Sequence, residues 1–234
     1  MQIVRMSPKK NTARAAARVV ATAHTVRGLQ EARRLGRGQV AFVELRLDAL
    51  AGDPGSLERS VPSIAAPILI TARHAAEGGS ARLSASIRRG LLAQFLPRAD
   101  AMDVELRSIR SMGALLEEAS RRGVTKIISF HDFRRTPNLP KLRETVRRAA
   151  GARADIVKVA TRLRSAGDLA ILLMLQASAT VPLATMGMGP LGKVSRLALA
   201  AAGSRLNYGY LDKPQVPGQW PALDLVRRIE EIMP

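Results

Sequence analysis

The sequence contains no cysteine, which excludes disulfide bonds, thiolate metal ligands and cysteine nucleophiles. This absence is typical of an intracellular protein, and we expect no redox chemistry from the chain itself. No apolar run reaches the roughly 18 residues that a membrane-spanning helix needs, and the opening residues MQIVRMSPKK lack the apolar stretch of a secretory signal. We therefore expect a cytoplasmic protein that does not associate with membranes.

Aromatic residues are also scarce, at 3% of 234 residues, whereas 37 lysines and arginines face 19 acidic residues and give a formal net charge of +18. Such an excess attracts phosphate polymers and small anions. A nucleic-acid surface would interleave aromatic rings among its cations for base stacking, so we expect no specific nucleic-acid partner. The arginine pairs instead predict a solvated surface, because they lie in helix-like segments: Arg88 and Arg89, Arg121 and Arg122, Arg147 and Arg148, and Arg227 and Arg228.

What the chain does contain is a repeated alternation of short apolar runs with helix-patterned segments. Clear helical patterns, with glycine or proline at or next to one of their ends, cover residues 83–96, 113–123, 141–151 and 167–178. The repeat of about 25 to 30 residues is that of a strand plus a crossover helix. Eight runs predict strands, at residues 19–23, 40–45, 67–71, 102–106, 126–130, 155–160, 181–186 and 206–210.

Eight such units favour an α/β fold of the closed (β/α)8 TIM barrel type, as a single domain over residues 16–234. An open dinucleotide-binding sheet loses its usual support, because no G-x-G-x-x-G follows the first run. The basic residues 1–15 are expected to form an arm or an added strand under the barrel. Barrels with an added N-terminal strand often pair, so we expect a homodimer.

Charged residues stand in or directly after many of these runs, where the active site of a barrel forms. In VELRLD, the residues Glu44, Arg46 and Asp48 alternate with apolar ones and are predicted to share one face of a strand. Asp103 and Glu105 are spaced in the same way. Burying so many charges is costly unless they are paired, so the pattern predicts a polar cavity, although ion pairs at the barrel rim are the alternative for any one of them.

Lys158 and His131 carry the clearest chemical signal. Lys158 lies between two valines in a strand that should be covered on both sides, where desolvation would lower its pKa and make its amine nucleophilic toward a ketone. The alternative is a lysine that extends to the rim and pairs with Glu105 or Asp155. His131 ends the preceding strand and could move the proton that an imine on Lys158 would acidify.

Two loops offer further candidates. The segment MGMGPLGKVSR, residues 186–196, can present backbone N–H groups, Lys193 and Arg196 to an anion, either phosphate or carboxylate. The turn before the last helix offers Gln219, although it can also be a plain Pro-Gly turn. His24 and His74 also follow apolar runs, but no H-x-H or H-E-x-x-H spacing is present, so no metal site is expected.

Taken together, the motifs ELRLD, ITARHAAEGG, DVEL, ISFHDFRRTP, DIVKVA, TMGMGPLGKVSRL and VPGQ, in this order, resemble those of type I 3-dehydroquinate dehydratase, the Schiff-base enzyme of the shikimate pathway. They cover about residues 40 to 219. The resemblance implies a hydro-lyase that removes water from 3-dehydroquinate by syn elimination to give 3-dehydroshikimate, with no metal or organic cofactor.

The resemblance also assigns a role to each matching position. It implies that Lys158 forms the imine, that His131 is the general base and then the acid, and that Glu77 orients His131. The remaining positions are substrate contacts: Glu44, Arg46 and Arg73 for the ring hydroxyls, Arg196 and Gln219 for the carboxylate, Met186 and Met188 as apolar contacts, Tyr208 as a nearby aromatic residue, and Gln215 in the lid.

The chain departs from the family pattern at a few positions. Gln215 and Val216 replace a small Ser or Thr followed by Ala, and Ala21 or Thr22 stands where bacterial relatives often have a serine. Two other functions remain open at this point. A class I aldolase or transaldolase would use the same lysine and bind phosphate in the 186–196 loop, and a basic nucleic-acid-binding or scaffolding protein would bind polyanions without imine chemistry.

Overall fold

The computed structural model describes residues 18–233, and its centre is a sheet of eight parallel strands. The strand order is β7-β6-β5-β4-β3-β2-β1-β8, so each strand pairs with its neighbour in the chain except where β1 pairs with β8. The strands are β1 (Val19–Ala23), β2 (Phe42–Arg46), β3 (Ile68–Thr71), β4 (Ala101–Glu105), β5 (Thr125–Asp132), β6 (Ile156–Arg162), β7 (Leu183–Met188) and β8 (Asn207–Tyr210).

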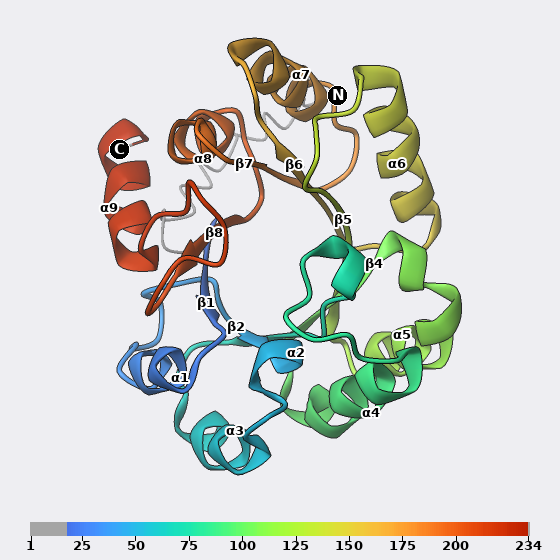
Figure 1. The fold of residues 1–234 in the computed structure, drawn as a ribbon, viewed down its shortest axis with the longest axis vertical. Helices are drawn as coiled ribbons and strands as arrows, with labels where there is room; N and C mark the ends of the chain where they lie inside the picture. The colour runs from blue at the N-terminus through green and yellow to red at the C-terminus, as the bar shows by residue number, and fades with distance from the viewer. Residues whose placement is uncertain (1–17, 234) are drawn as a thin grey trace, which may run out of the picture.

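The sheet curves into a nearly closed barrel, as the central ring of strands in Figure 1 shows. Between β7 and β8 the join is made by single contacts rather than by a ladder. The backbone N–H of Arg205 donates to Leu183 at 2.8 Å, and the Ser204 hydroxyl bonds the backbone of Thr185. The carboxyl ends of all eight strands therefore meet at one end of the molecule.

The helices surround this ring (Figure 1). They are α1 (Val26–Ala32), α2 (Leu47–Leu50), α3 (Pro54–Ser60), α4 (Ala85–Phe95), α5 (Gly113–Arg121), α6 (Leu139–Gly151), α7 (Ala166–Ala177), α8 (Gly192–Ala201) and α9 (Ala222–Ile232). Short 3₁₀ turns follow several strands: η2 (Val61–Ser63), η3 (Ala75–Glu77), η4 (Leu96–Arg98), η5 (Leu106–Ser108) and η6 (Arg110–Met112).

Local side chains define where the main helices begin. Ser84 accepts a hydrogen bond from Ile87 N–H before α4, and Asn138 does the same for Lys141 before α6. Ser165 and Asp168 form a reciprocal capping box at the start of α7. Among the described residues, no helix combines the length and the apolar character that crossing a membrane would require.

The alternation of side chains along the strands separates two environments. Outward-facing residues such as Val43, Leu45 and Val104 pack under the helices in the main core. Inside the barrel, a smaller apolar cluster that includes Val20, Leu69, Ala101 and Ile127 fills its amino-terminal end. The polar inward positions lie nearer the carboxyl ends, so the alternation builds an apolar base below a charged layer.

The predicted barrel is confirmed, and each of the eight predicted runs contains a strand. Boundaries differ by one or two residues, since β2 begins at Phe42 and β6 continues to Arg162. One expectation about the surface was wrong: Arg88 is only 2% exposed, because its side chain turns inward from α4. The predicted arm at residues 1–15 lies outside the described residues.

Candidate active site

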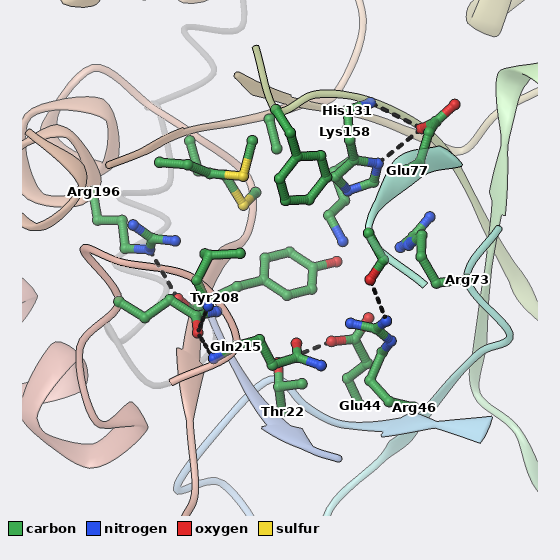
Figure 2. Close-up of a pocket in the computed structure, with 17 residues that line it drawn as sticks. Thr22, Glu44, Arg46, Arg73, Glu77, His131, Lys158, Arg196, Tyr208 and Gln215 are labelled. Carbon is green, nitrogen blue, oxygen red and sulfur yellow. Dashed lines mark hydrogen bonds and ion pairs between the residues drawn. The ribbon is translucent and has the colours of Figure 1, made fainter. Parts of the chain in front are cut away.

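A cavity opens at the carboxyl ends of the strands, and Figure 2 shows its charged side chains converging on one space. All twelve residues singled out from the sequence as catalytic or substrate-binding line it. They come from five of the eight strands, from the segments that follow β3 and β8, and from α8. Five lining residues were not among the twelve: Thr22, Gly78, Phe133, Ala160 and Val216.

Lys158 lies on β6 with its side chain inside the barrel and is 4% exposed. Its Nζ donates to Oδ2 of Asp103 at 3.0 Å and lies 3.8 Å from the ring centroid of Tyr208. Burial lowers the pKa of the Lys158 ammonium, although the carboxylates of Asp103 and Glu44 oppose this. The lysine therefore pairs with Asp103 inside the barrel, and not with Glu105 or Asp155 at the rim.

Asp103 belongs to a buried charge network that the sequence indicated only in part. Burial would raise its pKa, but Arg73 and Lys158 outweigh that effect and hold the pKa far below its usual value. Arg73 binds both oxygens of Asp103, at 2.8 and 2.9 Å, and also donates to Glu105. Arg88 pairs with the other oxygen of Glu105. Arg73 thus lines the cavity while most of its donors are engaged by carboxylates.

His131 is held by Glu77, which lies at the end of η3. Oε2 of Glu77 accepts from the backbone N–H of His131 at 2.9 Å and lies 3.0 Å from its Nδ1. Burial, together with the cations Arg73 and Lys158, keeps the pKa of His131 well below its ordinary value, so the imidazole is neutral. Because Nδ1 faces Glu77, Nε2 remains for the cavity.

Glu44 and Arg46 project inward from β2. Thr22 and Thr71 each donate to one oxygen of Glu44 at 2.8 Å, so the carboxylate is fixed from both neighbouring strands. Asp48 was expected on the same strand face, but β2 ends at Arg46 and Asp48 lies in α2. There it binds the Arg46 guanidinium through two hydrogen bonds of 3.0 and 2.8 Å, which orients Arg46 toward the cavity.

Arg196 reaches the cavity from α8. Its Nε and Nη1 donate to four backbone carbonyls, including those of Tyr208 and Gly218, and Nη2 makes no hydrogen bond within residues 18–233. Burial lowers the pKa of Arg196 to about 10, so the guanidinium stays charged at neutral pH. Lys193 does not join it as expected: its Nζ lies 4.7 Å from the centroid of the Trp220 ring, beside a neighbouring cavity.

The loop after β8 covers the cavity with Gln215, Val216 and Gln219. Oε1 of Gln219 accepts from the backbone N–H of Gln215 at 2.6 Å, so the two bulky residues are accommodated in an ordered turn. Tyr208 is buried beneath this loop. Within the described part of the chain its hydroxyl has no hydrogen-bond partner, and burial raises its pKa well above the ordinary value, so the phenol is protonated.

Met186 and Met188 complete the wall on the side of β7, where they pack with Ala160 and Tyr208. His24 and His74, the two other histidines, do not line the cavity. Over residues 18–233, no three histidine, aspartate or glutamate side chains are grouped as a metal site would require. The cavity combines an amine, a neutral imidazole and three arginines that line it, which suits proton transfer at a ketone carried by an anion.

Comparison with known proteins identifies what the chain is similar to. A family model described as Type I 3-dehydroquinase matches residues 18–232. A 3-dehydroquinate dehydratase of Methanocella arvoryzae is 34% identical over 86% of this chain and 90% of its own length. A crystal structure of 3-dehydroquinate dehydratase from Geobacillus kaustophilus superposes with a TM-score of 0.81 at 27% identity, covering 92% of this chain and 90% of that one. The structure of the 3-dehydroquinate dehydratase from Aquifex aeolicus superposes with a TM-score of 0.77 at 28% identity, covering 92% of this chain and 98% of that one.

Proposed function

The chain belongs to the type I 3-dehydroquinase family, and we propose that it removes water from 3-dehydroquinate through an imine on Lys158. The product is 3-dehydroshikimate. The observation that carries this proposal is the buried Lys158 amine in one cavity with a neutral, carboxylate-held His131. The enzyme is a hydro-lyase, as its family is.

The first step is attack of the Lys158 amine on the substrate ketone. The amine must first lose a proton, and burial favours that loss by lowering its pKa. Loss of water from the resulting carbinolamine gives an imine, whose positive charge draws electrons from the neighbouring carbon. Asp103, which holds the ammonium at 3.0 Å before the reaction, remains as the counter-ion of that charge.

The second step moves a proton between two atoms of the substrate. Nε2 of His131 takes the proton from the carbon next to the imine and then returns it to the departing hydroxyl, so one water leaves. Both transfers use the same imidazole face, which is consistent with a syn elimination. Water then hydrolyses the imine, releases the enone and restores the Lys158 amine.

The rest of the cavity holds the substrate in place. Glu44 and Arg46 are oriented by Thr22 and Asp48 and are placed to bind ring hydroxyls. On the opposite side, Nη2 of Arg196 and the side chain of Gln219 can bind the carboxylate of the substrate. Fixing both ends aligns the ketone with Lys158, which is how positioning lowers the barrier.

The proposed reaction uses neither a metal nor an organic cofactor, because the amine and the imidazole supply every transfer. A role in the shikimate pathway, a cytoplasmic location and a homodimer remain predictions.

The aldolase alternative needs a phosphate site in the 186–196 loop, and it is disfavoured because Lys193 contacts Trp220 instead of the cavity. A basic scaffolding protein is disfavoured too, because it would not require the buried pairs of Lys158 with Asp103 and of His131 with Glu77.

Borohydride trapping tests the proposal directly. Mixed with 3-dehydroquinate and borohydride, the protein should gain a covalent adduct that intact mass and peptide mapping place on Lys158. Lys158→Ala should form none. His131→Gln keeps the amine but lacks the base, so we expect its trapped adduct to be heavier by one water, since the intact substrate is captured before elimination.

A folded sample that traps no adduct and releases no ultraviolet-absorbing enone would exclude the dehydratase function. An adduct that persists in Lys158→Ala would place the imine on another amine. Inhibition by inorganic phosphate together with imine formation would favour an aldolase.

A further inference from the structure

Glu77, the carboxylate that holds His131, has a second ion-pair partner outside the cavity. Its Oε1 lies 3.1 Å from Nε of Arg107, whereas its Oε2 faces His131. Arg107 belongs to η5, directly after β4, and does not line the cavity. Its side chain is 50% exposed and that of Glu77 only 3%, so a surface cation reaches a buried carboxylate.

Other charged groups face Glu77 and His131 from the surrounding strands. Within residues 18–233, Arg107 is the only arginine or lysine within ion-pair distance of the Glu77 carboxylate. Arg73 lowers the pKa of Glu77 from a distance, but its guanidinium is paired with the carboxylates of Asp103 and Glu105. Glu105 has the opposite effect and raises the pKa of Glu77. The groups are Arg73 from the end of β3, Asp103 and Glu105 from β4, Lys158 from β6 and Arg46 from β2.

We propose that Arg107 is a positioning residue for the reaction proposed above: by binding the outer oxygen of Glu77 it keeps this carboxylate charged and aligned, so that Nδ1 of His131 carries the proton and Nε2 is free to act as the base. A carboxylate that accepts a hydrogen bond from one ring nitrogen of a histidine sets which nitrogen is protonated. Arg107 itself touches no substrate, because it lies outside the cavity wall.

The proposal gives a definite direction for the effect of pH. The pKa of Glu77 is raised to about 7, because the effect of burial exceeds the opposing effects of Arg73 and Arg107. The ionised form of Glu77 exists above that pKa and is lost as pH falls through it. A protonated Glu77 would donate to Nδ1 and leave the proton of a neutral imidazole on Nε2, where no base is then available. Removing Arg107 raises the pKa of Glu77, so the acidic limb of kcat should move to higher pH.

The kinetic test compares Arg107→Gln with Arg107→Lys and with Arg110→Gln. Arg110 is an exposed arginine on the adjacent turn η6 and makes no ion pair with Glu77, so it controls for loss of one surface charge. For Arg107→Gln we expect kcat at pH 7 to fall about two- to fivefold, because a smaller fraction of Glu77 is ionised there, with KM changed less than about twofold. The acidic limb should rise by about half a pH unit, because water screens the half-exposed Arg107, and Arg107→Lys should recover part of both effects.

A second readout does not depend on turnover. The chain has only three histidines, so ¹⁵N-histidine labelling separates the His131 signals and shows which nitrogen is protonated. As pH rises, the proton should move from Nε2 to Nδ1 with a midpoint near pH 7 in the wild type and in Arg110→Gln, and at a higher pH in Arg107→Gln. If the tautomer and the pH profile of Arg107→Gln match those of Arg110→Gln, the proposal is wrong. The measurement of the His131 tautomer tests the role of Arg107 even if the protein proves inactive toward 3-dehydroquinate.

Discussion

Burial and pairing decide what single side chains in this cavity can do. Lys158 and Asp103 are both buried inside the barrel and joined at 3.0 Å, yet desolvation still lowers the pKa of the lysine. A neutral amine is therefore easier to reach here than on the protein surface. Tyr208 presents the opposite case, because its hydroxyl is buried and has no partner among residues 18–233.

The unpaired hydroxyl of Tyr208 leads to one prediction about the stability of the free enzyme and another about its KM. A buried hydroxyl without a hydrogen bond costs about 1 to 3 kcal/mol, so the isosteric change Tyr208→Phe should leave the free enzyme equally stable or more stable. If substrate supplies the missing hydrogen bond, the same variant should raise KM about tenfold, equivalent to roughly 1.4 kcal/mol. Thermal melting and steady-state kinetics measure the two effects, and an unchanged KM would show that the hydroxyl does not meet the substrate.

At the scale of elements, the periods of strands and helices sort charged residues into different environments. On β4, Asp103 and Glu105 face the barrel interior while Met102 and Val104 face the helices. On α4, Arg88 lies in line with Leu92 and Phe95, which are also buried, whereas Arg89 points to solvent. This helical spacing distinguishes the two arginines, although an arginine pair by itself suggests a solvated surface.

The Arg88 side chain is predicted to be essential for stability. Arg88→Ala would leave one oxygen of the buried Glu105 without its cation, and removing one partner of a buried pair costs about 3 to 5 kcal/mol. The neighbouring change Arg89→Ala is the control and should alter the free energy of unfolding by less than about 0.5 kcal/mol. Urea denaturation compares the two, and equal midpoints would mean that Arg73 alone compensates Glu105.

The whole molecule carries a net charge of +18, which no feature of the proposed reaction requires. Some surface arginines are paired locally with glutamates, as Arg121 and Arg122 are with Glu118. The 37 lysines and arginines outnumber the 19 acidic residues, so many of these cations have no acidic residue to balance them. Repulsion among like charges destabilises a compact state and is screened by salt.

We therefore predict that the melting temperature rises as sodium chloride is increased from a few millimolar to about 0.15 M, where charges more than about 8 Å apart are screened. Sodium sulfate at matched ionic strength is the control. Equal melting temperatures in the two salts indicate general screening, whereas a larger rise in sulfate indicates a bound anion. A fall in melting temperature with chloride would contradict the prediction, since it would mean that attractive pairs dominate.

Much of the architecture could be predicted from local pattern. Apolar runs with period two and helical segments with period 3.6 are set by neighbours along the chain, so eight strands and their order could be inferred without coordinates. The positions of His131 and Lys158 followed from the same logic, since His131 lies next to the last residue of β5 and Lys158 lies inside β6. The sequence by itself therefore determined the fold class and which residues gather at one end of the barrel.

The partners of those residues depended on closure of the barrel. Curvature brings Glu77 from the loop after β3 to His131 on β5, and Asp103 from β4 to Lys158 on β6, across strands that are not adjacent. Arg107 and Arg88 reach buried carboxylates from outside the ring, whereas Lys193 turns away to Trp220. No local period specifies such contacts, because they depend on distances between segments far apart in the chain, and only the tertiary structure decided them.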